Sequence, residues 1–318
     1  GANISKSVGL PTVALFIQWL KCHTRANSLE SNSMENIVST FDGISCLQIA
    51  LNRQGLEYKN YYASEIDTHC IKITQKNYPN TIQKGNICDL TKADFPENID
   101  LLVGGSPCQG FSLMGRQLNF NDDRSKLFFE FVRLKDELNP KWFILENVVM
   151  RQDIQDAISD LLGVKPIKIN SALFSGQNRK RLYWTNIPNV EQKIAQSVAS
   201  LPQITGKSIL TDQTYEIATV RKGKNGSPRQ IVKPATDKLG CLTASYYKGV
   251  NADGRPAKSK FFGDYEAGKI EMLSPVECER LQTVPEGYTE GISKTQRYKA
   301  LGNGFTVEVI SFILGCIP

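Results

Sequence analysis

A cysteine in a glycine-rich loop is the side chain in this sequence best suited to nucleophilic chemistry. The loop Gly104-Gly105-Ser106-Pro107-Cys108-Gln109-Gly110 follows the apolar segment Asp100–Val103, which is typical of a buried strand. Open α/β sheets bind ligands at the carboxyl ends of their strands, so Cys108 is expected at such an edge. A free cysteine is more often a small buried residue, but the Gly, Ser, Pro and Gln neighbours argue against burial here. Beside a helix N-terminus or a cation, its thiolate would act as a nucleophile.

A carboxylic acid and two arginines could share that edge. The apolar strand predicted at Trp142–Leu145 ends in Glu146, which would face the same crevice as Cys108. Arg179 and Arg181 alternate before a strand at 182–185, so they lie on one face of an extended segment. In this context the arginines are expected to bind a base, a phosphate or Glu146. The alternative is a solvated strand end followed by a basic surface stretch.

A second group of residues indicates a nucleotide-like cofactor. A strand ending at Phe41 runs into Asp42-Gly43, where a glycine permits close approach of the backbone to a ligand. Glu65 ends the next predicted strand, at the separation from Gly43 at which an acid binds ribose hydroxyls in nucleotide-binding folds. The turn holds one glycine of the usual glycine-rich pattern. An adenosine ligand without phosphates, such as S-adenosylmethionine, therefore suits it better than a dinucleotide.

The elements that must position these side chains alternate along the chain. Strands and helices are predicted in turn, which indicates a parallel sheet covered by helices on both faces. Two further helices are expected after Met272. The predicted strands are 36–41, 58–64, 100–104, 142–145 and 182–185, and the predicted helices are 45–52, a segment ending at Tyr78, 127–138, 275–282 and 306–314.

Composition excludes several classes of protein. The chain has 318 residues, 41% of them hydrophobic, which is enough for one large core with a smaller lobe. Eight cysteines form no CxxC pair and there are two histidines, so no metal site is expected. The apolar run at 13–20 is too short to span a bilayer and lacks a cleavage site after it. Residues 1–33 differ in composition from the rest and are treated as an extension of unknown role.

The middle of the chain is basic and rich in turn residues. Residues 201–270 hold 12 Lys and Arg against 6 Asp and Glu, an excess equal to the net charge of +6 of the whole chain. Eight glycines and four prolines interrupt any long periodic pattern there. The segment is either a solvated, loop-rich lobe or a lobe that faces nucleic acid.

Together these motifs resemble the cytosine-5 DNA methyltransferase family of bacterial and phage type. The resemblance covers most of residues 36–312 outside the middle lobe, and its pieces occur in family order, which leaves little room for chance. The pieces are Phe41-Asp42-Gly43, Glu65, Gly85-Asn86-Ile87, Gly105-Ser106-Pro107-Cys108-Gln109, Glu146-Asn147-Val148, Gln177-x-Arg179-x-Arg181, Leu273-Ser274-Pro275, Glu279-Arg280-Leu281-Gln282 and Gly302-Asn303-Gly304.

The resemblance implies a catalytic role for four residues. A target cytosine is flipped out of duplex DNA, and Cys108 attacks carbon 6 of the ring. Glu146 then binds ring nitrogen 3 and the exocyclic amine, and Arg181 binds the carbonyl oxygen. Arg179 positions the flipped nucleotide and the loop. Carbon 5 takes the methyl group of S-adenosylmethionine, a base removes the carbon 5 proton, and elimination releases Cys108.

The resemblance also implies the cofactor-binding residues. Phe41 is expected to stack on adenine and Glu65 to bind the ribose, while Asn86 stands where the family usually has Asp. Ser45 replaces a frequent glycine, and Gly304 replaces a frequent serine. The full expected set is Phe41, Asp42, Gly43, Ile44, Glu65, Ile66, Asn86, Ile87, Gly105, Pro107, Leu127, Asn303 and Gly304.

Contacts to double-stranded DNA are expected from two regions. Residues 111–126 would form a mobile loop that closes over the DNA, and the middle lobe would recognise the target sequence in the major groove. Thr243 is placed in a short strand at 241–245 near the DNA. The expected DNA-binding residues are Ser112, Arg116, Arg124, Arg221, Lys222, Lys224, Arg229 and Thr243.

The resemblance predicts an α/β fold: a Rossmann-like mixed sheet with helices on both faces, as in S-adenosylmethionine-dependent methyltransferases, plus a smaller irregular target-recognition domain. The expected division is 1–33 as an extension, 34–188 as the catalytic and cofactor-binding domain, 189–270 as the recognition domain and 271–318 as a return to the catalytic domain. A cytoplasmic monomer of bacterial or phage origin is expected. Whether a cognate restriction endonuclease accompanies it stays open.

Three other functions compete with this one. A tRNA cytosine-5 methyltransferase would share the catalytic core, but the Cys-Phe-Thr signature of its animal-type members is absent. An inert DNA-binding regulator would have lost Cys108 or Glu146, and both are present. A nicotinamide-dependent oxidoreductase would explain Glu65 but not the cysteine, the acid and the two arginines together.

Overall fold

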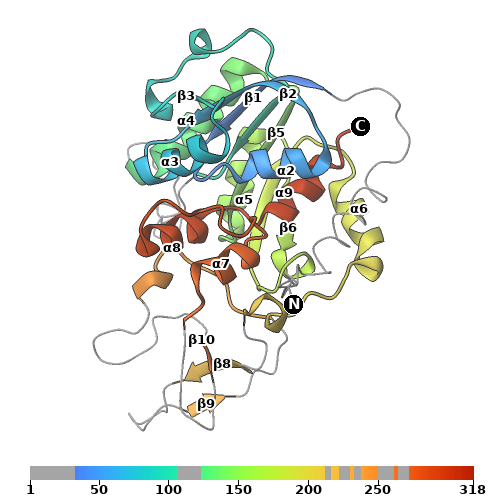
Figure 1. Ribbon diagram of the computed structural model, residues 1–318. Coiled ribbons are helices and arrows are strands. Elements are labelled where there is room, and N and C mark those ends of the chain that lie inside the picture. Colours follow the sequence, from blue (N-terminus) through green and yellow to red (C-terminus); the bar gives the residue numbers. More distant parts are fainter. Residues whose placement is uncertain are drawn as a thin grey trace, which may run out of the picture.

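The protein is built around one large sheet, with a small second sheet beside it (Figure 1). The computed structural model describes residues 33–106, 123–211, 216–221, 230–232, 238–248, 261–263 and 272–318. Seven strands form the large sheet in the order β3-β2-β1-β4-β5-β7-β6. They are β1 (Met34–Thr40), β2 (Tyr58–Ser64), β3 (Ile82–Gln83), β4 (Leu101–Gly104), β5 (Trp142–Val148), β6 (Ile167–Asn170) and β7 (Lys180–Thr185).

The strands build two cores because alternate residues point to opposite faces of the sheet. In β4, Leu101 and Val103 join one hydrophobic cluster, while Leu102 between them joins the other. Likewise in β1, Ile37 belongs to the first cluster and Val38 to the second. All five side chains are at most 1% exposed. Strands that are apolar on both faces require helices on both faces, as the sequence predicts.

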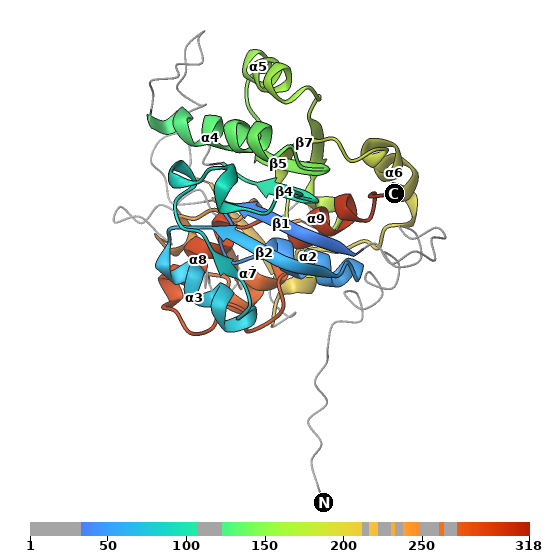
Figure 2. The same cartoon turned by 90° about the horizontal axis from the view of Figure 1, so that it is seen from above.

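Helices cover each face (Figure 2). One face carries α4 (Asp123–Leu138) and α5 (Gln152–Leu162). The other face carries α2 and α3 from the first half of the chain and α7 to α9 from its end. The bounds are α2 (Cys46–Gln54), α3 (Thr68–Asn77), α6 (Val190–Ser197), α7 (Pro275–Leu281), α8 (Lys294–Asn303) and α9 (Val307–Leu314), with short 3-10 turns η1 (Ile87–Asp89), η2 (Lys92–Asp94), η4 (Ser171–Leu173), η5 (Val198–Ser200), η6 (Lys207–Ile209) and η7 (Tyr246–Lys248).

The strand order creates a crevice between β1 and β4. The chain moves outward from β1 through β2 to β3, then returns to lay β4 on the other side of β1. At such a switch point the connections leave the carboxyl ends of the two strands in opposite directions. The turn after β1 and the loop after β4 therefore flank an open site.

The end of the chain completes the large core rather than forming a separate lobe. Helix α9 packs against α2, where Arg53 and Glu308 form an ion pair at 2.6 Å and Gln54 donates to Ser311 at 3.0 Å. The α9 side chains from Val307 to Leu314 are all buried.

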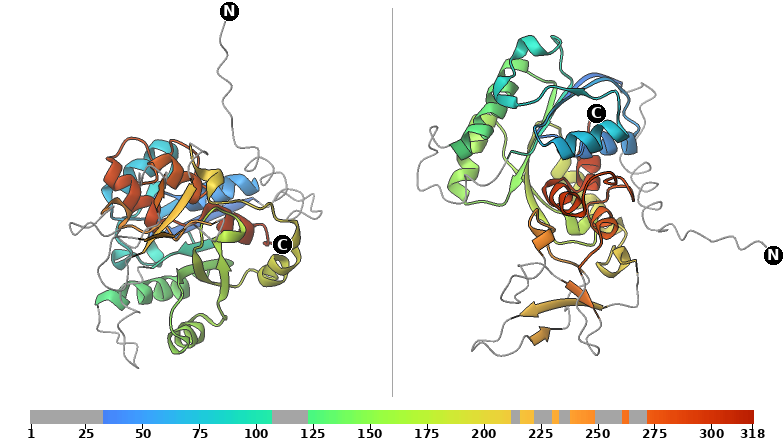
Figure 3. Two further views of the ribbon diagram at one scale, coloured as in Figure 1. Left: turned by 90° about the horizontal axis from the view of Figure 1, so that it is seen from below. Right: turned by 60° about the vertical axis from the view of Figure 1, so that its left-hand side comes forward.

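A small antiparallel sheet lies apart from the large one. Its order is β10-β8-β9, from β8 (Glu216–Arg221), β9 (Gln230–Val232) and β10 (Phe261–Gly263). Figures 1 and 3 show it projecting from the body that contains the large sheet. Other parts of the expected recognition segment, such as Leu201, Leu239 and Tyr246, belong to the main core. The domain boundaries at 188 and 270 stay predictions.

Strand β7 runs antiparallel to both of its neighbours, so the sheet is mixed, which confirms the fold that the resemblance predicts. The structure corrects two details of the predicted elements. Helices α5, α6 and α8 were not predicted. The strand expected at 241–245 is wrong: the segment is an irregular stretch that leads into η7. Side chains from the large domain, rather than a neighbouring strand, bind its backbone; Gln177, for example, accepts from the amide of Leu242 at 3.2 Å.

In the described part of the chain, no helix has the length and apolar character needed to cross a membrane.

Candidate functional site

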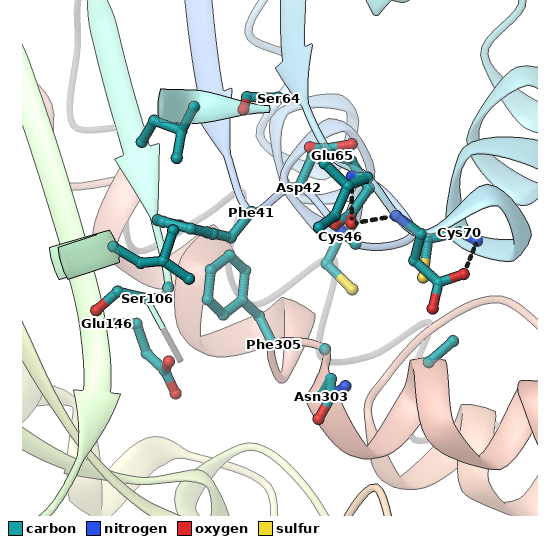
Figure 4. A pocket seen from close by; sticks show the side chains of 18 of the residues that line it. Phe41, Asp42, Cys46, Ser64, Glu65, Cys70, Ser106, Glu146, Asn303 and Phe305 are labelled. Atoms are coloured by element: carbon teal, nitrogen blue, oxygen red, sulfur yellow. Dashed lines mark hydrogen bonds between the residues drawn. The ribbon is translucent and has the colours of Figure 1, made fainter. Parts of the chain in front are cut away.

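A cavity of about 380 Å³ opens at the carboxyl ends of β1, β2, β4 and β5. Residues that follow these strands form most of its wall, and a segment near the chain's end, 300–305, forms the opposite side (Figure 4). It is lined by Phe41, Asp42, Gly43, Cys46, Ser64, Glu65, Ile66, Asp67, Cys70, Gly85, Asn86, Ile87, Gly105, Ser106, Leu127, Glu146, Asn147, Val148, Arg179, Arg181, Ala300, Gly302, Asn303, Gly304 and Phe305.

The turn after β1 uses an unusual backbone. Phe41, Gly43 and Ser45 all have positive φ, at 53°, 58° and 57°. Glycine adopts this region without strain, but a residue with a Cβ does not. Ser45 occupies the N-cap of α2 in this left-handed conformation. The turn thus reverses the chain within a few residues and brings its backbone to the cavity.

The buried carboxyl group of Asp42 stabilises the turn after β1 through hydrogen bonds. The Asp42 carboxyl accepts from the Tyr61 hydroxyl at 2.6 Å and from the Ser45 hydroxyl. Gln48 donates to Ser45 at 3.1 Å and extends the network to Thr81. Burial raises the pKa of Asp42 to about 6, although these hydroxyl donors act to lower it. The turn therefore rests on a group that titrates near neutrality.

Glu65 links the ends of β1 and β2. One carboxylate oxygen accepts from the amide of Gly43 at 2.7 Å, and the other accepts from the amides of Ile66 and Asp67 at 2.8 Å (Figure 4). Three backbone donors fix the carboxylate at the cavity, and its remaining lone pairs can accept from a ligand. Ile66, next to it, is 71% exposed and offers an apolar surface at the rim.

Asn86 lines the cavity beyond Glu65. Its side-chain oxygen accepts from the amide of Cys88 at 3.1 Å and caps η1. An amide oxygen has two lone pairs, so one partner does not exhaust it. Ile87 and Leu127 line the same part of the wall. This half combines an aromatic ring, apolar side chains and a fixed carboxylate.

Glu146 and Arg181 form an ion pair on the other side of the cavity. Arg181 Nε lies 3.0 Å from Glu146 Oε1, and the two side chains are 15% and 12% exposed. They come from paired antiparallel strands, because Val148 of β5 stands opposite Arg181 of β7. Burial acts to lower the pKa of Arg181, but the charge of Glu146 opposes it and the pKa is raised. The pair therefore offers a carboxylate oxygen and cationic N–H donors to one planar ligand.

Arg179 has a different environment from Arg181. It is 4% exposed and donates to the carbonyl oxygens of Leu242 at 2.8 Å, Gly304 at 3.1 Å and Gly302 at 3.3 Å. Its guanidinium group thereby ties the segment at 238–248 to the loop after α8. Arg179 meets the cavity, but in this structure it holds protein backbone.

Cys241 lies between the two arginines. Its sulfur accepts from Arg179 at 3.4 Å and more distantly from Arg181 at 3.8 Å. The sequence analysis did not select it. Thr243 nearby is exposed, and its hydroxyl lies 3.2 Å from the hydroxyl of Ser245.

Asn147 fixes the beginning of the loop that carries Cys108. It is 2% exposed and donates to the hydroxyl and the carbonyl oxygen of Ser106, at 3.1 and 3.3 Å. Its own oxygen accepts from the amide of Val148 at 2.8 Å. The loop after β4 and the end of β5 are therefore joined next to Glu146.

The structure brings most of the expected residues to this cavity. Ile44 is an exception: it is 1% exposed, packs in the core and is not among the residues that line the cavity, so its assignment to the cofactor site stays a prediction. Several expected residues lie outside the described part of the chain, namely Pro107, Cys108, Ser112, Arg116, Lys222, Lys224 and Arg229, and the side chains of Arg124 and Arg221 are also outside it.

Phe305 is the most informative residue that the sequence analysis missed. Its ring points into the cavity (Figure 4), and it directly follows the Gly302-Asn303-Gly304 motif. That adjacency was the available signal. Cys46 and Cys70 also line the cavity, and burial raises the pKa of Cys46 to about 12. Apolar surroundings thus keep the Cys46 thiol protonated and unreactive.

Comparison with known proteins identifies one family. The model of the family described as C-5 cytosine-specific DNA methylase matches residues 35–184 and 150–318. The type II methyltransferase M1.ScrFI of Lactococcus lactis subsp. cremoris is 29% identical over 307 residues, covering 87% of this chain and 76% of the relative. The type II methyltransferase M.HhaI of Haemophilus parahaemolyticus is 26% identical over 304 residues, covering 87% and 92%.

Solved structures share the fold at low sequence identity. The Entamoeba histolytica methyltransferase EhMeth superposes with a TM-score of 0.65 at 20% identity, over 89% of this chain and 97% of that structure. The S. pombe Dnmt2 methyltransferase superposes with a TM-score of 0.63 at 19% identity, over 88% and 96%. These similarities show a shared fold, which is the arrangement of the helices and strands.

Proposed function

The chain belongs to the C-5 cytosine-specific DNA methylase family, and from this premise we propose that the cavity at the ends of the strands binds both S-adenosylmethionine and a flipped cytosine. A single observation carries the proposal. The same cavity is lined by Glu65, which backbone amides hold in place, and by the Glu146–Arg181 ion pair. One acid suits a ribose, and the ion pair suits a planar base with donors and acceptors on its edge. Methyl donor and acceptor would thus meet in one enclosed space.

The residues present fit an adenosine-type cofactor. Glu65 keeps acceptor capacity for ribose hydroxyls, and Phe41 and Ile66 offer aromatic and apolar surfaces for a base. Asn86 contributes an amide where the family usually has a carboxylate. When bound, S-adenosylmethionine supplies a methyl group on a positively charged sulfur. Phe41, Asp42, Gly43, Glu65, Ile66, Asn86, Ile87, Gly105, Leu127, Asn303 and Gly304 would hold it, with Pro107 from the loop.

Glu146 and Arg181 are proposed to hold the cytosine. Arg181 keeps the Glu146 carboxylate in place through its Nε, and one further nitrogen donates to the carbonyl oxygen of Lys180 at 2.9 Å, so the guanidinium hydrogens that remain would meet the base. Glu146 would bind ring nitrogen 3 and the amine, and Arg181 the carbonyl oxygen. Glu146 therefore stabilises the charge that develops when Cys108 adds to carbon 6. The sulfur–carbon 6 bond forms first and carbon 5 is methylated. A base then takes the carbon 5 proton, and the Cys108 thiolate leaves.

Arg179 is proposed to act through the loop and the recognition segment. It binds the carbonyl oxygens of Leu242 and Gly304, so it joins the segment at 238–248 to the loop after α8 that lines the cavity. A lysine could not replace its several directed donors. Arg179→Lys is therefore expected to weaken transfer of the methyl group and binding of the cofactor together.

Double-stranded DNA is the proposed macromolecular substrate, and the enzyme is proposed to act as a cytoplasmic monomer. Ser112, Arg116 and Arg124 would meet the DNA from the loop after β4. Arg221, Lys222, Lys224 and Arg229 would meet phosphates from the lobe that contains β8, with Thr243 nearby. A cognate restriction endonuclease would be a functional partner rather than a bound subunit.

Trapping the covalent intermediate tests the proposal most directly. The protein is expressed in a host without cytosine methylation, and bisulfite sequencing of the host DNA identifies the target sequence. Target DNA that carries 5-fluorocytosine should then trap the protein, because fluorine cannot leave carbon 5 as a proton does. We expect the adduct with the native protein and with the control Cys88→Ser, but none with Cys108→Ser.

The same variants separate chemistry from binding. Cys108→Ser should still bind S-adenosylhomocysteine like the native protein, as measured by calorimetry, because Cys108 is not proposed to bind the cofactor. Full methyl transfer by Cys108→Ser would remove this cysteine from the mechanism. Methylation of tRNA rather than DNA in a side-by-side assay would favour the tRNA enzyme over the DNA enzyme. If the protein methylates neither DNA nor tRNA but still binds DNA, the result would favour a regulator.

A further inference from the structure

The ring of Phe305 narrows the cavity between its two halves. Phe305 follows the end of α8 after one residue, is 8% exposed, and packs with the main core while it faces the cavity. Figure 4 shows the ring directed into the cavity, away from the C-terminal segment that carries it. A large, rigid side chain in this place limits the shape of whatever lies beside it.

Gly105, at the start of the Cys108 loop, shows how tightly that ring fits. A Cβ added to Gly105 would lie 2.8 Å from Cε1 of Phe305 and 3.3 Å from Oε2 of Glu146. The first distance is far below an ordinary carbon–carbon contact. The ring and the Glu146 carboxylate therefore flank one small space above Gly105. No residue but glycine fits at position 105 while the ring stays where it is.

This space separates the two binding regions of the proposed function. Phe41, Glu65 and Asn86 form the side proposed for the nucleoside, and Glu146 and Arg181 form the side proposed for the base. A group that passes from one ligand to the other crosses the space beside the ring. The ring thus bounds the reacting centre itself.

We propose that Phe305 is a specificity-determining residue that sets the size of the group this enzyme can transfer, admitting methyl and excluding larger alkyl groups. The inference rests on the proposed function of the same cavity. Transfer of either kind of group breaks a sulfur–carbon bond, leaves the electron pair on sulfur as a neutral thioether, forms the bond to carbon 5 and releases the carbon 5 proton to a base. The bonds that form and break are the same for both, and binding of the two cofactors, which involves no transfer, isolates the steric fit of the group from its reactivity.

Binding without DNA gives the first test. The probes are S-adenosylhomocysteine, which has no transferable group, and the S-allyl analogue of S-adenosylmethionine. We expect Phe305→Val to bind the S-allyl analogue roughly 10- to 100-fold more tightly than the native protein, as measured by calorimetry, the range that added methylene groups produce in an apolar pocket. Its affinity for S-adenosylhomocysteine should change by less than about threefold.

Two further variants guard against a simple loss of folding. Phe305→Leu removes less of the ring's volume and should give a smaller gain of the same sign. Phe312→Leu alters a buried phenylalanine of α9 that does not line the cavity and should leave the ratio of the two affinities unchanged. Thermal unfolding of each variant confirms that the protein compared is folded. An equal gain in Phe312→Leu would overturn the proposal.

The second test enlarges the side chain at position 105 and reduces the one at position 305. Gly105→Ala should lose most methyl transfer, because its Cβ displaces the ring or the Glu146 carboxylate. Adding Phe305→Val to Gly105→Ala should restore transfer to at least about a tenth of the Phe305→Val rate, because the ring no longer occupies that space. If Gly105→Ala alone is fully active, or if the second change restores nothing, the two residues do not bound the reacting centre.

The outcomes distinguish this inference from the proposed function. If the native protein transfers methyl but Phe305→Val accepts the S-allyl analogue no better, the function stands and the role of Phe305 falls. If the native protein binds neither S-adenosylmethionine nor S-adenosylhomocysteine, the proposed cofactor site fails, and the role of Phe305 fails with it.

Discussion

At the scale of single residues, Asp42 combines a buried charge with a structural role. The residue is 6% exposed, its carboxyl group binds within the turn after β1, and burial raises its pKa to about 6 from the 3.8 of an ordinary aspartate. Below pH 3.8 Asp42 is protonated in both the folded and the unfolded chain, so no buried charge opposes folding. Between 3.8 and 6 the unfolded chain ionises while the folded chain keeps its proton, so stability falls across this window, and the loss is complete above about pH 6.

Asp42→Asn should therefore stabilise the fold at alkaline pH and much less at acid pH. The amide keeps an acceptor for Tyr61 or Ser45 but carries no charge. We expect a gain on the order of 1–3 kcal/mol in the free energy of unfolding near pH 8, which shrinks toward zero near pH 4. Chemical denaturation at the two pH values measures it. A gain of equal size at both would show that ionisation of Asp42 is not its cause.

Ser45 shows how this chain departs from the glycine usual at that position. The residue keeps the left-handed backbone, with φ at 57°, and its hydroxyl donates to Asp42. Ser45→Gly and Ser45→Ala both remove the hydroxyl, but only alanine retains a strained Cβ. We expect the alanine variant to be less stable than the glycine variant by about 1 kcal/mol in denaturant unfolding. Equal stabilities would mean that the Asp42 contact, and not the backbone, governs this position.

The sequence predicted single site residues where a polar side chain follows directly after an apolar strand. Glu65 and Glu146 were selected by their places after strands, and both line the cavity. Phe305 was not selected, because an aromatic residue after a glycine motif is ordinarily part of a core. Its contact with Gly105 joins residues two hundred positions apart, which no local pattern records.

At the scale of elements, a buried ion pair joins α7 to α8. Glu279 is fully buried and pairs with Arg297 at 2.9 Å, and its carboxylate also accepts from the amides of Gly287 and Thr289. These contacts hold the connection between the two helices and, through α8, the loop that lines the cavity. Glu279, the first residue of the Glu279-Arg280-Leu281-Gln282 motif, therefore has a structural role.

Removing one partner of this pair should destabilise the protein strongly. Glu279→Ala leaves the Arg297 guanidinium without its carboxylate and the amides of Gly287 and Thr289 without their acceptor, so we expect a loss of about 3–5 kcal/mol in the free energy of unfolding. The control Glu286→Ala breaks an ion pair with Arg280 in which Glu286 is 54% exposed, and should cost at most about 1 kcal/mol. Similar losses for both variants in urea unfolding would contradict this difference.

The elements themselves were predictable to different degrees. Apolar strands such as β1, β4 and β5 were predicted because both faces of each are buried. Helix α8 was missed because its sequence from Lys294 to Asn303 is largely polar, although Ser293 ahead of it is an N-cap whose hydroxyl accepts from the amide of Gln296. The reversed direction of β7 depends on its pairing with β5 and β6 across the sheet. Local sequence does not encode that pairing.

At the scale of the whole molecule, positive charge is concentrated in the segment proposed to face DNA. Each phosphate contact releases counterions, so the logarithm of the affinity falls linearly with the logarithm of salt concentration. Lys222→Gln and Lys224→Gln should each reduce the magnitude of that slope by about 1 and weaken binding to all sequences alike. Lys59→Gln, an exposed change at the opposite end of β2 from the cavity, should leave the slope unchanged. Filter binding across salt concentrations compares them.

If Lys222→Gln and Lys224→Gln weakened binding to the target sequence alone, these lysines would read bases rather than contact phosphates. Composition predicts a large α/β body and a basic lobe, because turn residues and charge separate the middle from the rest, and this division stays a prediction. The sequence did not predict how much of residues 201–270 joins the large core, because Leu239 and Tyr246 are isolated apolar residues among polar ones.

The cavity wall supplied by residues 300–305 has a consequence for synthesis of the protein. Translation delivers β1, β2, β4 and β5 first, yet the segment at 300–305 that completes the cavity wall comes about 270 residues after β1 starts at Met34. A nascent chain on the ribosome therefore carries every strand of the sheet with an open, unfinished site. It cannot enclose a methyl donor until residues 300–305 have been synthesised.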